Sequence, residues 1–435
     1  MEPEAFRQIV ADSLAEGLPP ALTPREGRMP SLSPGGRVLA VVGPRRAGKT
    51  FFLYQMMGEI LRAGRAARDE ILFVDFEDYR LRDARPEDAE TLLEAFAQAT
   101  GKPPRFLLFD EIHRLPHWSR VLRTLHNRRR YAIAVTGSNA ALLASDVATE
   151  LRGRYEDRLV LPFSFREFLR HRGLSPDVRR LDAPGRGLVA RAFDDYLRRG
   201  GFPEAATLEP ESARRRLLQS YFDTIFFNDL VERHGIRARH LLDLLMRNAL
   251  EGAASVFSIS AFEKQLKARG LPGSKRSIAE YLRRLEEAFF LATSEKFDFS
   301  PRRRTMNPKK TYLMDTGFAL LGGAFSENRG RLLENAVALE FFRRRRRFFY
   351  AKGEGECDFV VQSGTRPAEA WQVCWEVNTG TEAREVRGLL GAMREFKIPR
   401  GGILTSAQEG TRRADGREIL LTPVWKWLLS APIED

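Results

Sequence analysis

The chain has 435 residues, of which 43% are hydrophobic and 30% charged, and a formal net charge of +13. This composition is typical of an ordered, soluble protein with two or three domains. No apolar run is long enough to span a bilayer, which argues against a membrane protein. The acidic N-terminus lacks a signal-peptide pattern, and Cys357 and Cys374 are too few for a disulfide framework or a zinc site. A cytoplasmic location without membrane contact is therefore predicted.

The excess of positive charge indicates a polyanionic partner, and we expect that partner to be DNA. Much of the excess lies in arginine clusters at residues 128–130, 214–216, 302–304 and 343–347. A genomic bias toward arginine, with the clusters simply exposed to solvent, is the alternative explanation.

The first strong motif is GPRRAGKT at residues 43–50, which matches the phosphate-loop pattern GxxxxGK[ST]. An apolar run at 37–42 precedes it and a helical segment at 51–57 follows, so the motif has the strand–loop–helix context that a phosphate loop requires. Lys49 would reach the β- and γ-phosphates of ATP, and the Thr50 hydroxyl would ligate Mg²⁺. A chance match in a glycine-bearing turn is the alternative. The nucleotide-binding residues that we expect are Gly43, Pro44, Arg45, Arg46, Ala47, Gly48, Lys49, Thr50 and Phe51.

Strands and helices alternate after this loop, which indicates a parallel sheet. Further strands are predicted at residues 71–75, 106–109, 131–135 and 159–161. Asp110 and Glu111 follow the third strand and form a Walker B pattern beside the phosphate loop. Asp110 would hold the water shell of Mg²⁺, and Glu111 would orient the attacking water. An Asp-Glu pair that merely caps a following helix is the alternative.

Two further catalytic roles are assigned from position along the chain. Asn139 or Ser138, at the end of the fourth strand, would contact the γ-phosphate or the attacking water, although a turn explains these residues equally well. Arg154, or its competitor Arg152, would stabilise the developing charge, either within its own chain or on a neighbouring subunit. Either arginine is equally well explained as a surface residue.

With these residues placed, the chain resembles a group of prokaryotic AAA+-like P-loop ATPases. Their C-terminal domain of unknown function is related to the restriction-endonuclease fold. The resemblance implies an ATP-dependent, DNA-associated protein. The matching segments are GPRRAGKT, FLLFDEIHRLPHWSRVLRTL, VTGSNA, LRGRYEDRLVLPFSFREF, YLRRGGFPEA, IAEYLRRLEEAFFL, TYLMDTG, LLENAV and ECDFVV.

The expected fold class is α/β, with an ASCE-type parallel-sheet ATPase domain followed by helical, winged-helix and nuclease-like parts. In the winged-helix part, helices are predicted at 261–269 and 277–290, and a hairpin carrying residues 302–304 and Lys309-Lys310 would form a basic wing. A winged helix used only for packing within the chain is the alternative. The expected domains are 1–165 (ATPase), 166–250 (helical lid), 251–318 (winged helix) and 319–435 (restriction-endonuclease-like).

A metal site in the last domain is what the resemblance to nucleases implies, and the sequence departs from it. Glu334 and Asp358 match the first two acids of such a core. Gln372 and Cys374 stand where glutamate and lysine are expected, and a cysteine cannot supply the positive charge of lysine. Lys352 is a candidate to replace it. A degenerate nuclease domain is therefore predicted.

The function that we predict is an ATP-hydrolysing, DNA-associated switch, with a homo-oligomer compatible with the sequence. An ATP-regulated, metal-dependent nuclease is one alternative. A regulatory nucleotide-binding module that acts on a protein partner is the other.

Overall fold

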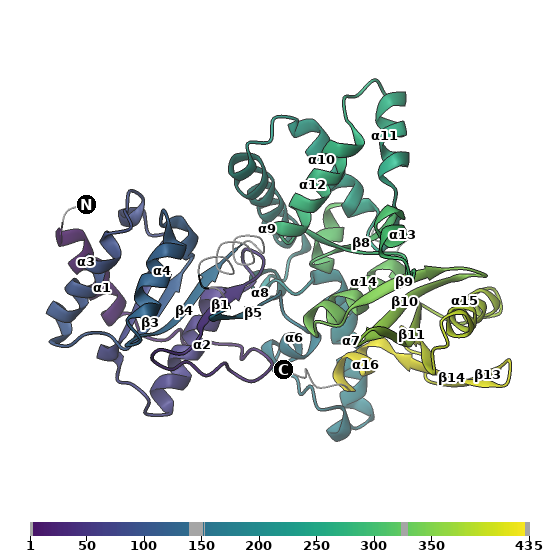
Figure 1. Ribbon diagram of the computed structural model, residues 1–435. Helices are drawn as coiled ribbons and strands as arrows, with labels where there is room; N and C mark the ends of the chain where they lie inside the picture. Colours follow the sequence, from purple (N-terminus) through teal and green to yellow (C-terminus); the bar gives the residue numbers. More distant parts are fainter. Residues whose placement is uncertain (1–2, 139–150, 152, 323–328, 431–435) are drawn as a thin grey trace. The chain divides into compact units, whose positions relative to one another are not determined.

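The computed structural model describes residues 3–138, 151, 153–322 and 329–430. Contacts divide the chain into two compact units, Met1–Leu161 and Pro162–Asp435, which are described separately below (Figure 1). In the described residues, every helix is too short or too polar to cross a membrane.

The first unit is built on a five-stranded parallel sheet with the order β2-β3-β4-β1-β5. This order confirms the predicted ASCE-type sheet. Three central strands are buried along their whole length, which explains their continuous apolar runs. The strands are β1 (Val38–Val42), β2 (Ile71–Asp75), β3 (Phe106–Asp110), β4 (Ala132–Gly137) and β5 (Tyr155–Leu159).

The last strand of this sheet was predicted too late in the chain. The expected strand at residues 159–161 is wrong, because β5 covers Tyr155–Leu159 and pairs with β1. As an edge strand it is half exposed and carries polar residues, so it lacks the apolar run by which the inner strands are recognised. The helices of this unit are α1 (Pro3–Ala15), α2 (Lys49–Arg62), α3 (Asp88–Thr100) and α4 (Trp118–Asn127), with short 3-10 turns at η1 (Arg68–Glu70), η2 (Tyr79–Leu81) and η3 (Ile112–Arg114).

The second unit begins with a series of helices, of which α10 and α12 pack on a small antiparallel sheet of order β6-β8-β7, whereas α6 and α7 pack against α16. The helices are α6 (Phe165–His171), η5 (Val178–Arg180), α7 (Ala183–Arg199), α8 (Pro203–Thr207), α9 (Glu211–Thr224), the π-helical η6 (Ile225–Glu232), α10 (Arg239–Glu251), α11 (Ile259–Ala268) and α12 (Lys275–Glu287). The strands are β6 (Ser255–Phe257), β7 (Leu291–Ser294) and β8 (Lys309–Leu313).

Helices α11 and α12 lie where the sequence predicted two helices, and β7 and β8 pair as the antiparallel hairpin that a wing requires. Residues 302–304 lie in the connection of this hairpin, where they form a short helix, α13 (Pro301–Met306). Lys309 and Lys310 were expected in that loop, but they belong to strand β8, where Lys310 is buried. The winged-helix assignment stays a prediction. The short 3-10 helix η7 (Thr316–Leu321) follows β8.

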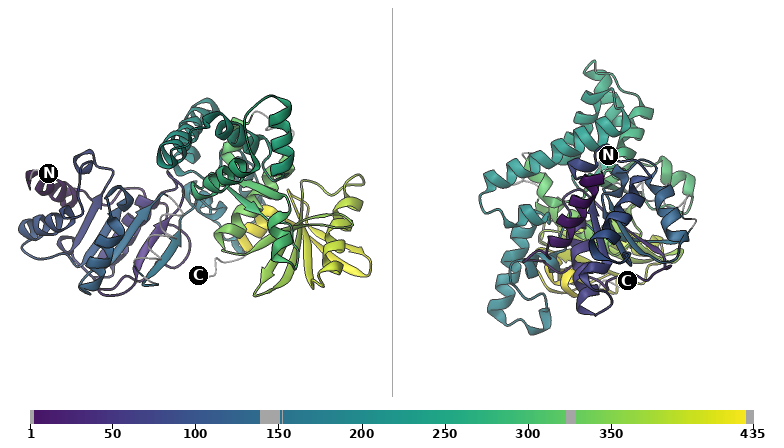
Figure 2. Two further views of the ribbon diagram at one scale, coloured as in Figure 1. Left: turned by 45° about the horizontal axis from the view of Figure 1, so that its top comes forward. Right: turned by 90° about the vertical axis from the view of Figure 1, so that its left-hand side faces the viewer.

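The unit ends in a six-stranded mixed sheet of order β13-β14-β12-β11-β10-β9 (Figure 2). Helix α15 packs on one face, and α14 and α16 pack on the other. Cys357 and Cys374 are buried free thiols in this sheet. Its elements are α14 (Arg329–Arg343), β9 (Phe348–Lys352), β10 (Glu356–Ser363), β11 (Arg366–Cys374), α15 (Glu382–Glu395), β12 (Arg400–Thr405), β13 (Gly410–Ala414), β14 (Arg417–Pro423) and α16 (Val424–Ser430).

Candidate nucleotide-binding site

The phosphate loop connects β1 to α2, which begins at Lys49. Gly48 has a φ of 92°, in the left-handed region that favours glycine. At Gly43, a Cβ would come within 1.9 Å of the Val160 carbonyl oxygen, so the backbone could not pass there with a side chain. The loop thus leads the free N–H groups of the first turn of α2 to the carboxyl edge of the sheet, where they can receive an anion.

Asp110 lies at the end of β3 and is held by two hydroxyl groups. Thr50 Oγ1 donates to Asp110 Oδ2 at 2.6 Å, and Thr136 Oγ1 donates to Asp110 Oδ1. Burial raises the pKa of Asp110 to about 6, although the hydrogen bonds from Thr136 and Thr50 act in the opposite direction. The hydrogen bond between Thr50 and Asp110 joins the two residues that the sequence assigned to Mg²⁺.

The oxygen donors of this pair fit Mg²⁺, a hard cation that binds one or two protein oxygens and completes its shell with water and substrate phosphates. Among the described residues there is no cluster of three or more His, Cys, Asp or Glu side chains that could hold a metal ion. Thr50 and Asp110 therefore suit an ion that arrives with a nucleotide, and a permanently bound metal would need more ligands.

Glu111 directly follows Asp110 and is buried between two basic groups. Its Oε1 lies 3.3 Å from Lys49 Nζ, and its Oε2 lies 3.2 Å from His113 Nδ1. Burial raises the pKa of Glu111, but the charges of Lys49 and His113 outweigh it, and the net shift is downward. The carboxylate is therefore ionised at neutral pH, as a group that accepts a hydrogen bond from water must be.

The backbone of Glu111 is held in the left-handed region with a φ of 46°, which is rare for a residue with a long side chain. Its N–H donates to Thr136 Oγ1 at 2.8 Å. Thr136 therefore fixes both acids, one through its carboxylate and the other through its backbone. The sequence analysis assigned the sensing role to Ser138 and Asn139, which follow Thr136 closely in the chain.

Of the two residues predicted to have the sensing role, Ser138 belongs to the described part of the chain. Ser138, which is 1% exposed, directly follows β4, and its hydroxyl has no hydrogen-bond partner among the residues that the structure describes. Asn139 lies outside the described residues. The sensing role of either residue stays a prediction.

The phosphate loop is also tied to the sheet by an acid that the sequence did not single out. Glu77 Oε1 lies 3.0 Å from Arg45 Nη1 and 2.8 Å from Arg114 Nη2. Burial raises the pKa of Glu77, but the two guanidinium groups lower it to about 2. Its place just beyond β2, at the carboxyl edge of the sheet, is the signal that could have identified it.

Arg154 lies at the amino ends of the parallel strands, whereas the phosphate loop lies at their carboxyl ends. Its carbonyl accepts from the N–H of Val38, the first residue of β1, whereas the loop follows Val42, the last. The length of β1 therefore separates the backbone of Arg154 from the phosphate loop by roughly 13 Å. Arg154 therefore does not fit a role on the phosphates of its own chain, and a role on a neighbouring copy stays a prediction. Arg152 lies outside the described residues.

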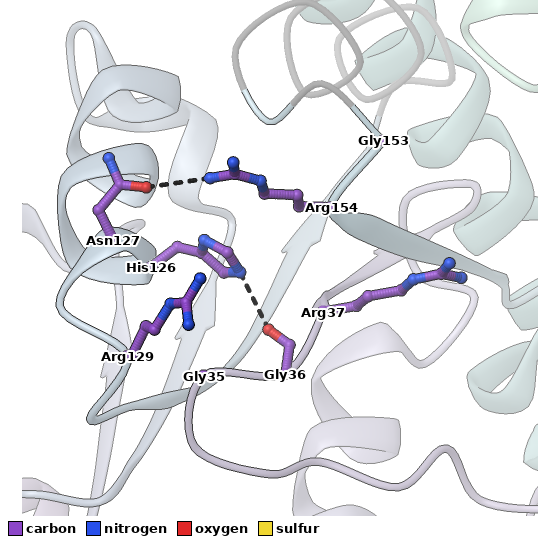
Figure 3. Close-up of a pocket in the computed structure, with 8 residues that line it drawn as sticks. All are labelled: Gly35, Gly36, Arg37, His126, Asn127, Arg129, Gly153 and Arg154. Atoms are coloured by element: carbon purple, nitrogen blue, oxygen red, sulfur yellow. Dashed lines mark hydrogen bonds between the residues drawn. The ribbon is translucent and has the colours of Figure 1, made fainter.

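At that end of the strands Arg154 lines a basic pocket of about 590 Å³ (Figure 3). Its Nη1 donates to Asn127 Oδ1 at 3.3 Å, and the nearby His126 Nε2 lies 3.0 Å from the Gly36 carbonyl oxygen. The lining residues are Gly35, Gly36, Arg37, His126, Asn127, Arg129, Gly153 and Arg154.

In the second unit, the residues predicted from the resemblance to nucleases meet around a lysine. Glu334 on α14 and Asp358 on β10 both contact Lys310 Nζ, at 2.8 and 2.9 Å. Gln372 accepts from the N–H of Asp358 at 3.2 Å and donates to Glu385. A metal does not fit between these acids, because the ammonium group of Lys310 already lies there. Sequence reasoning missed Lys310 and Glu385 and took the lysine for part of a wing.

Many arginines of the sequence clusters are engaged within the chain. Arg214 is buried and donates to the Leu208 carbonyl oxygen at 2.9 Å. These contacts leave fewer of the clustered cations for a partner than the sequence indicated. Further ion pairs join Arg128 to Glu90, Arg303 to Asp298, Arg344 to Glu340 and Arg346 to Glu369.

Comparison with known protein families places the first unit. A family model described as an AAA domain matches residues 35–169, and a domain of unknown function, DUF8612, matches residues 190–325. The chain is 30% identical to the uncharacterized protein MJ1544 of Methanocaldococcus jannaschii over 405 residues, which cover 91% of this chain and 88% of the relative. The chain belongs to the family of that protein.

One further relative and one solved structure were also found to be similar. An uncharacterized protein of Haemophilus influenzae is 27% identical over 393 residues, which cover 89% of this chain and 94% of the relative. The solved structure of the Walker-type ATPase PABY2304 of Pyrococcus abyssi aligns with 73% of this chain and 94% of its own, at 16% identity and a TM-score of 0.44. The AAA match and the order of the sheet confirm that the first unit is an AAA-type P-loop ATPase domain. The relation of the last sheet to restriction endonucleases stays a prediction.

Proposed function

We propose that this protein binds ATP with Mg²⁺, hydrolyses it, and uses the cycle to change how its second unit engages DNA. The observation that carries the hydrolytic part is the network Thr50–Asp110–Thr136–Glu111–Lys49 at one edge of the sheet. These five residues provide a cation ligand pair, a phosphate-binding ammonium group and an ionised carboxylate for water, and they are joined by hydrogen bonds and one ion pair.

Each residue has a distinct role in the proposed reaction. Lys49 binds the β- and γ-phosphates and neutralises charge on them. Glu111 accepts a hydrogen bond from the water that attacks the γ-phosphorus, and the bond between that phosphorus and the oxygen of the leaving ADP breaks. Thr50 and Asp110 would hold Mg²⁺, which when bound supplies charge neutralisation at the phosphates.

The DNA-associated part of the proposal rests on charge. The formal net charge of +13 favours a polyanion, and exposed basic residues stand at the start of α12, where Lys275 and Arg276 follow the capping residue Ser274. Such a helix start suits contact with phosphate groups. A nuclease is not proposed, because Lys310 lies between the acids that would hold the metal.

The proposal is tested by steady-state ATP hydrolysis with and without double- and single-stranded DNA, at two salt concentrations. We expect Lys49→Ala to abolish hydrolysis and the surface control Lys102→Ala to retain it. DNA should stimulate the wild type at low salt, and the double variant Lys275→Ala/Arg276→Ala should lose that stimulation while keeping its basal rate.

Two results would count against parts of this scheme. Unchanged hydrolysis in Lys49→Ala would refute the nucleotide site. Hydrolysis that ignores DNA at both salt concentrations would remove the DNA part and favour a regulatory module that acts on a protein partner.

A further inference from the structure

Lys310 is a buried lysine whose ammonium group is surrounded by three carboxylates. Its side chain is 3% exposed, and its Nζ lies 2.8 Å from Glu334, 3.0 Å from Glu356 and 2.9 Å from Asp358. An ammonium group has three donors and no acceptor; here it donates a hydrogen bond to Asp358 and forms ion pairs with Glu334 and Glu356. A buried lysine without such partners would be strongly destabilising, since its charge would lose the solvation of water.

The carboxylates are themselves held in position by neighbouring groups. Glu334 Oε1 accepts from the Tyr312 hydroxyl at 2.9 Å, and Asp358 Oδ2 accepts from the N–H of Val373 at 2.9 Å. Tyr312 lies two residues after Lys310 on β8, so both side chains point to the same face of the strand. The acids are therefore arranged around the ammonium group by contacts from several elements.

The distances between Lys310 Nζ and the oxygens of this acid cluster (Glu334, Glu356 and Asp358) fit an ammonium group better than a divalent metal. The three N–O distances lie between 2.8 and 3.0 Å. Mg²⁺ requires oxygen ligands at about 2.0–2.1 Å, and Ca²⁺ at about 2.3–2.6 Å. The oxygens would have to move inward by roughly 0.5–0.9 Å each, and the lysine would have to leave, before either ion could bind.

The lysine and its acids come from different substructures of the second unit. Lys310 belongs to the three-stranded sheet, Asp358 and Glu356 belong to the six-stranded sheet, and Glu334 lies on α14. Beside Glu334, the Asn335 side chain accepts from the N–H of Leu313 at 2.8 Å and donates to its carbonyl at 2.9 Å. Strand β8 is thus fixed to α14 at two adjacent points.

We propose that the ammonium group of Lys310 is the resident cation of this acid cluster, at the place where the resemblance to nucleases implies a divalent metal. It ties β8 to α14 and β10, and it makes the second unit independent of metal ions. This role is separate from ATP hydrolysis in the first unit. It follows that removal of the ammonium group leaves a site for a small external cation, either an alkylammonium ion or Mn²⁺.

The test measures thermal unfolding and Mn²⁺ binding in proteins that all carry Asp110→Asn, so that the nucleotide site lacks its carboxylate ligand for a metal. Lys310→Ala should lower the Tm by about 5 °C or more, because it leaves three acids without their buried counter-charge. Ethylammonium or Mn²⁺, at ionic strength matched with NaCl, should restore part of this loss. The matched control Lys309→Ala should unfold like its parent and should not respond to either cation.

Two further measurements make the proposal falsifiable even if Lys310→Ala does not fold. The parent protein should bind no Mn²⁺ by electron paramagnetic resonance, and the wild type should not cleave plasmid DNA with Mn²⁺. If Lys310→Ala folds, Asp358→Asn added to it should abolish the cation response. One Mn²⁺ per chain in the parent, lost in Glu356→Gln, would overturn the proposal. Mn²⁺-dependent cleavage of plasmid DNA by the wild type, lost in Asp358→Asn, would also overturn it, because Lys310 would then serve a nuclease.

Discussion

Lys49 and Glu111 form a buried ion pair, with Nζ 3.3 Å from Oε1. The sequence assigned one of them to the phosphates of ATP and the other to the attacking water. Because each neutralises the other, a nucleotide competes with Glu111 for the charge of Lys49. The pair therefore couples phosphate binding to the position of the water-binding carboxylate.

Glu111→Gln is expected to separate binding from hydrolysis. The amide cannot act as an ionised acceptor for water, so kcat should fall by about 100-fold or more. The same change removes the charge that competes for Lys49, so ATP should bind at least as tightly as to the wild type. Single-turnover hydrolysis and equilibrium binding measure the two effects. An unchanged kcat would show that Glu111 does not position the water, and Glu156→Gln, on exposed β5, is the control.

Thr136→Val is expected to impair catalysis although Thr136 has no assigned contact with ATP. The change keeps the shape but removes the hydroxyl that joins Asp110 to the Glu111 backbone. We expect kcat to fall by about 10-fold or more, with a smaller change in KM. Thr136→Ser keeps the hydroxyl and should retain most activity. Equal activity of the valine and serine variants would refute the positioning role.

Arg154 is expected to act on a neighbouring copy of the chain. Arg154→Ala and Lys49→Ala should each be inactive alone, and their mixture should recover hydrolysis. In the mixture, the intact nucleotide site of an Arg154→Ala chain can lie beside the intact Arg154 of a Lys49→Ala chain. Arg130→Ala, an exposed arginine before β4, is the matched control and should remain active. Wild-type activity of Arg154→Ala, or an inactive mixture, would contradict this role.

Asp315 should make the stability of the second unit fall as pH rises. Its carboxylate is buried and accepts from the N–H groups of Gly201 and Gly317 at 2.7 and 2.8 Å. Burial raises its pKa from 3.8 to about 7. The folded state therefore binds more protons than the unfolded state between about pH 4 and 7, and stability falls as pH rises across that window. Urea unfolding at several pH values measures the free energy of unfolding, which should change less with pH in Asp315→Asn than in the wild type.

The structure brings the phosphate loop and the Asp110-Glu111 pair together, as the sequence predicted, because the sequence signals of both are local. The phosphate loop and the Asp110-Glu111 pair each follow a buried apolar strand, and the topology of a parallel sheet brings such strand ends to one edge. Edge strand β5 was misplaced because exposed residues carry no apolar pattern. For Arg154 the sequence left a role within the chain and a role on a neighbouring subunit open, because position along the chain does not show at which end of the strands a residue lies.

The acid cluster of the second unit was only half predicted. Glu334 and Asp358 were found from a resemblance, but Lys310 was read with Lys309 as an exposed basic pair. Only the tertiary fold brings Lys310 to acids that lie 24 and 48 residues further along the chain. The local signal in the sequence was that Lys310 and Tyr312 are two residues apart, as side chains on the same face of a strand are.

The burial of Lys310 also makes it a chemical reporter. A buried ammonium group paired with three carboxylates stays protonated and has no lone pair to offer an acylating reagent, so brief treatment with such a reagent should leave Lys310 unmodified while exposed lysines react. Modification of this one position, followed by mass spectrometry, would then record when strand β8 separates from its acids. The same experiment with ATP and DNA present would reveal whether either ligand loosens that junction.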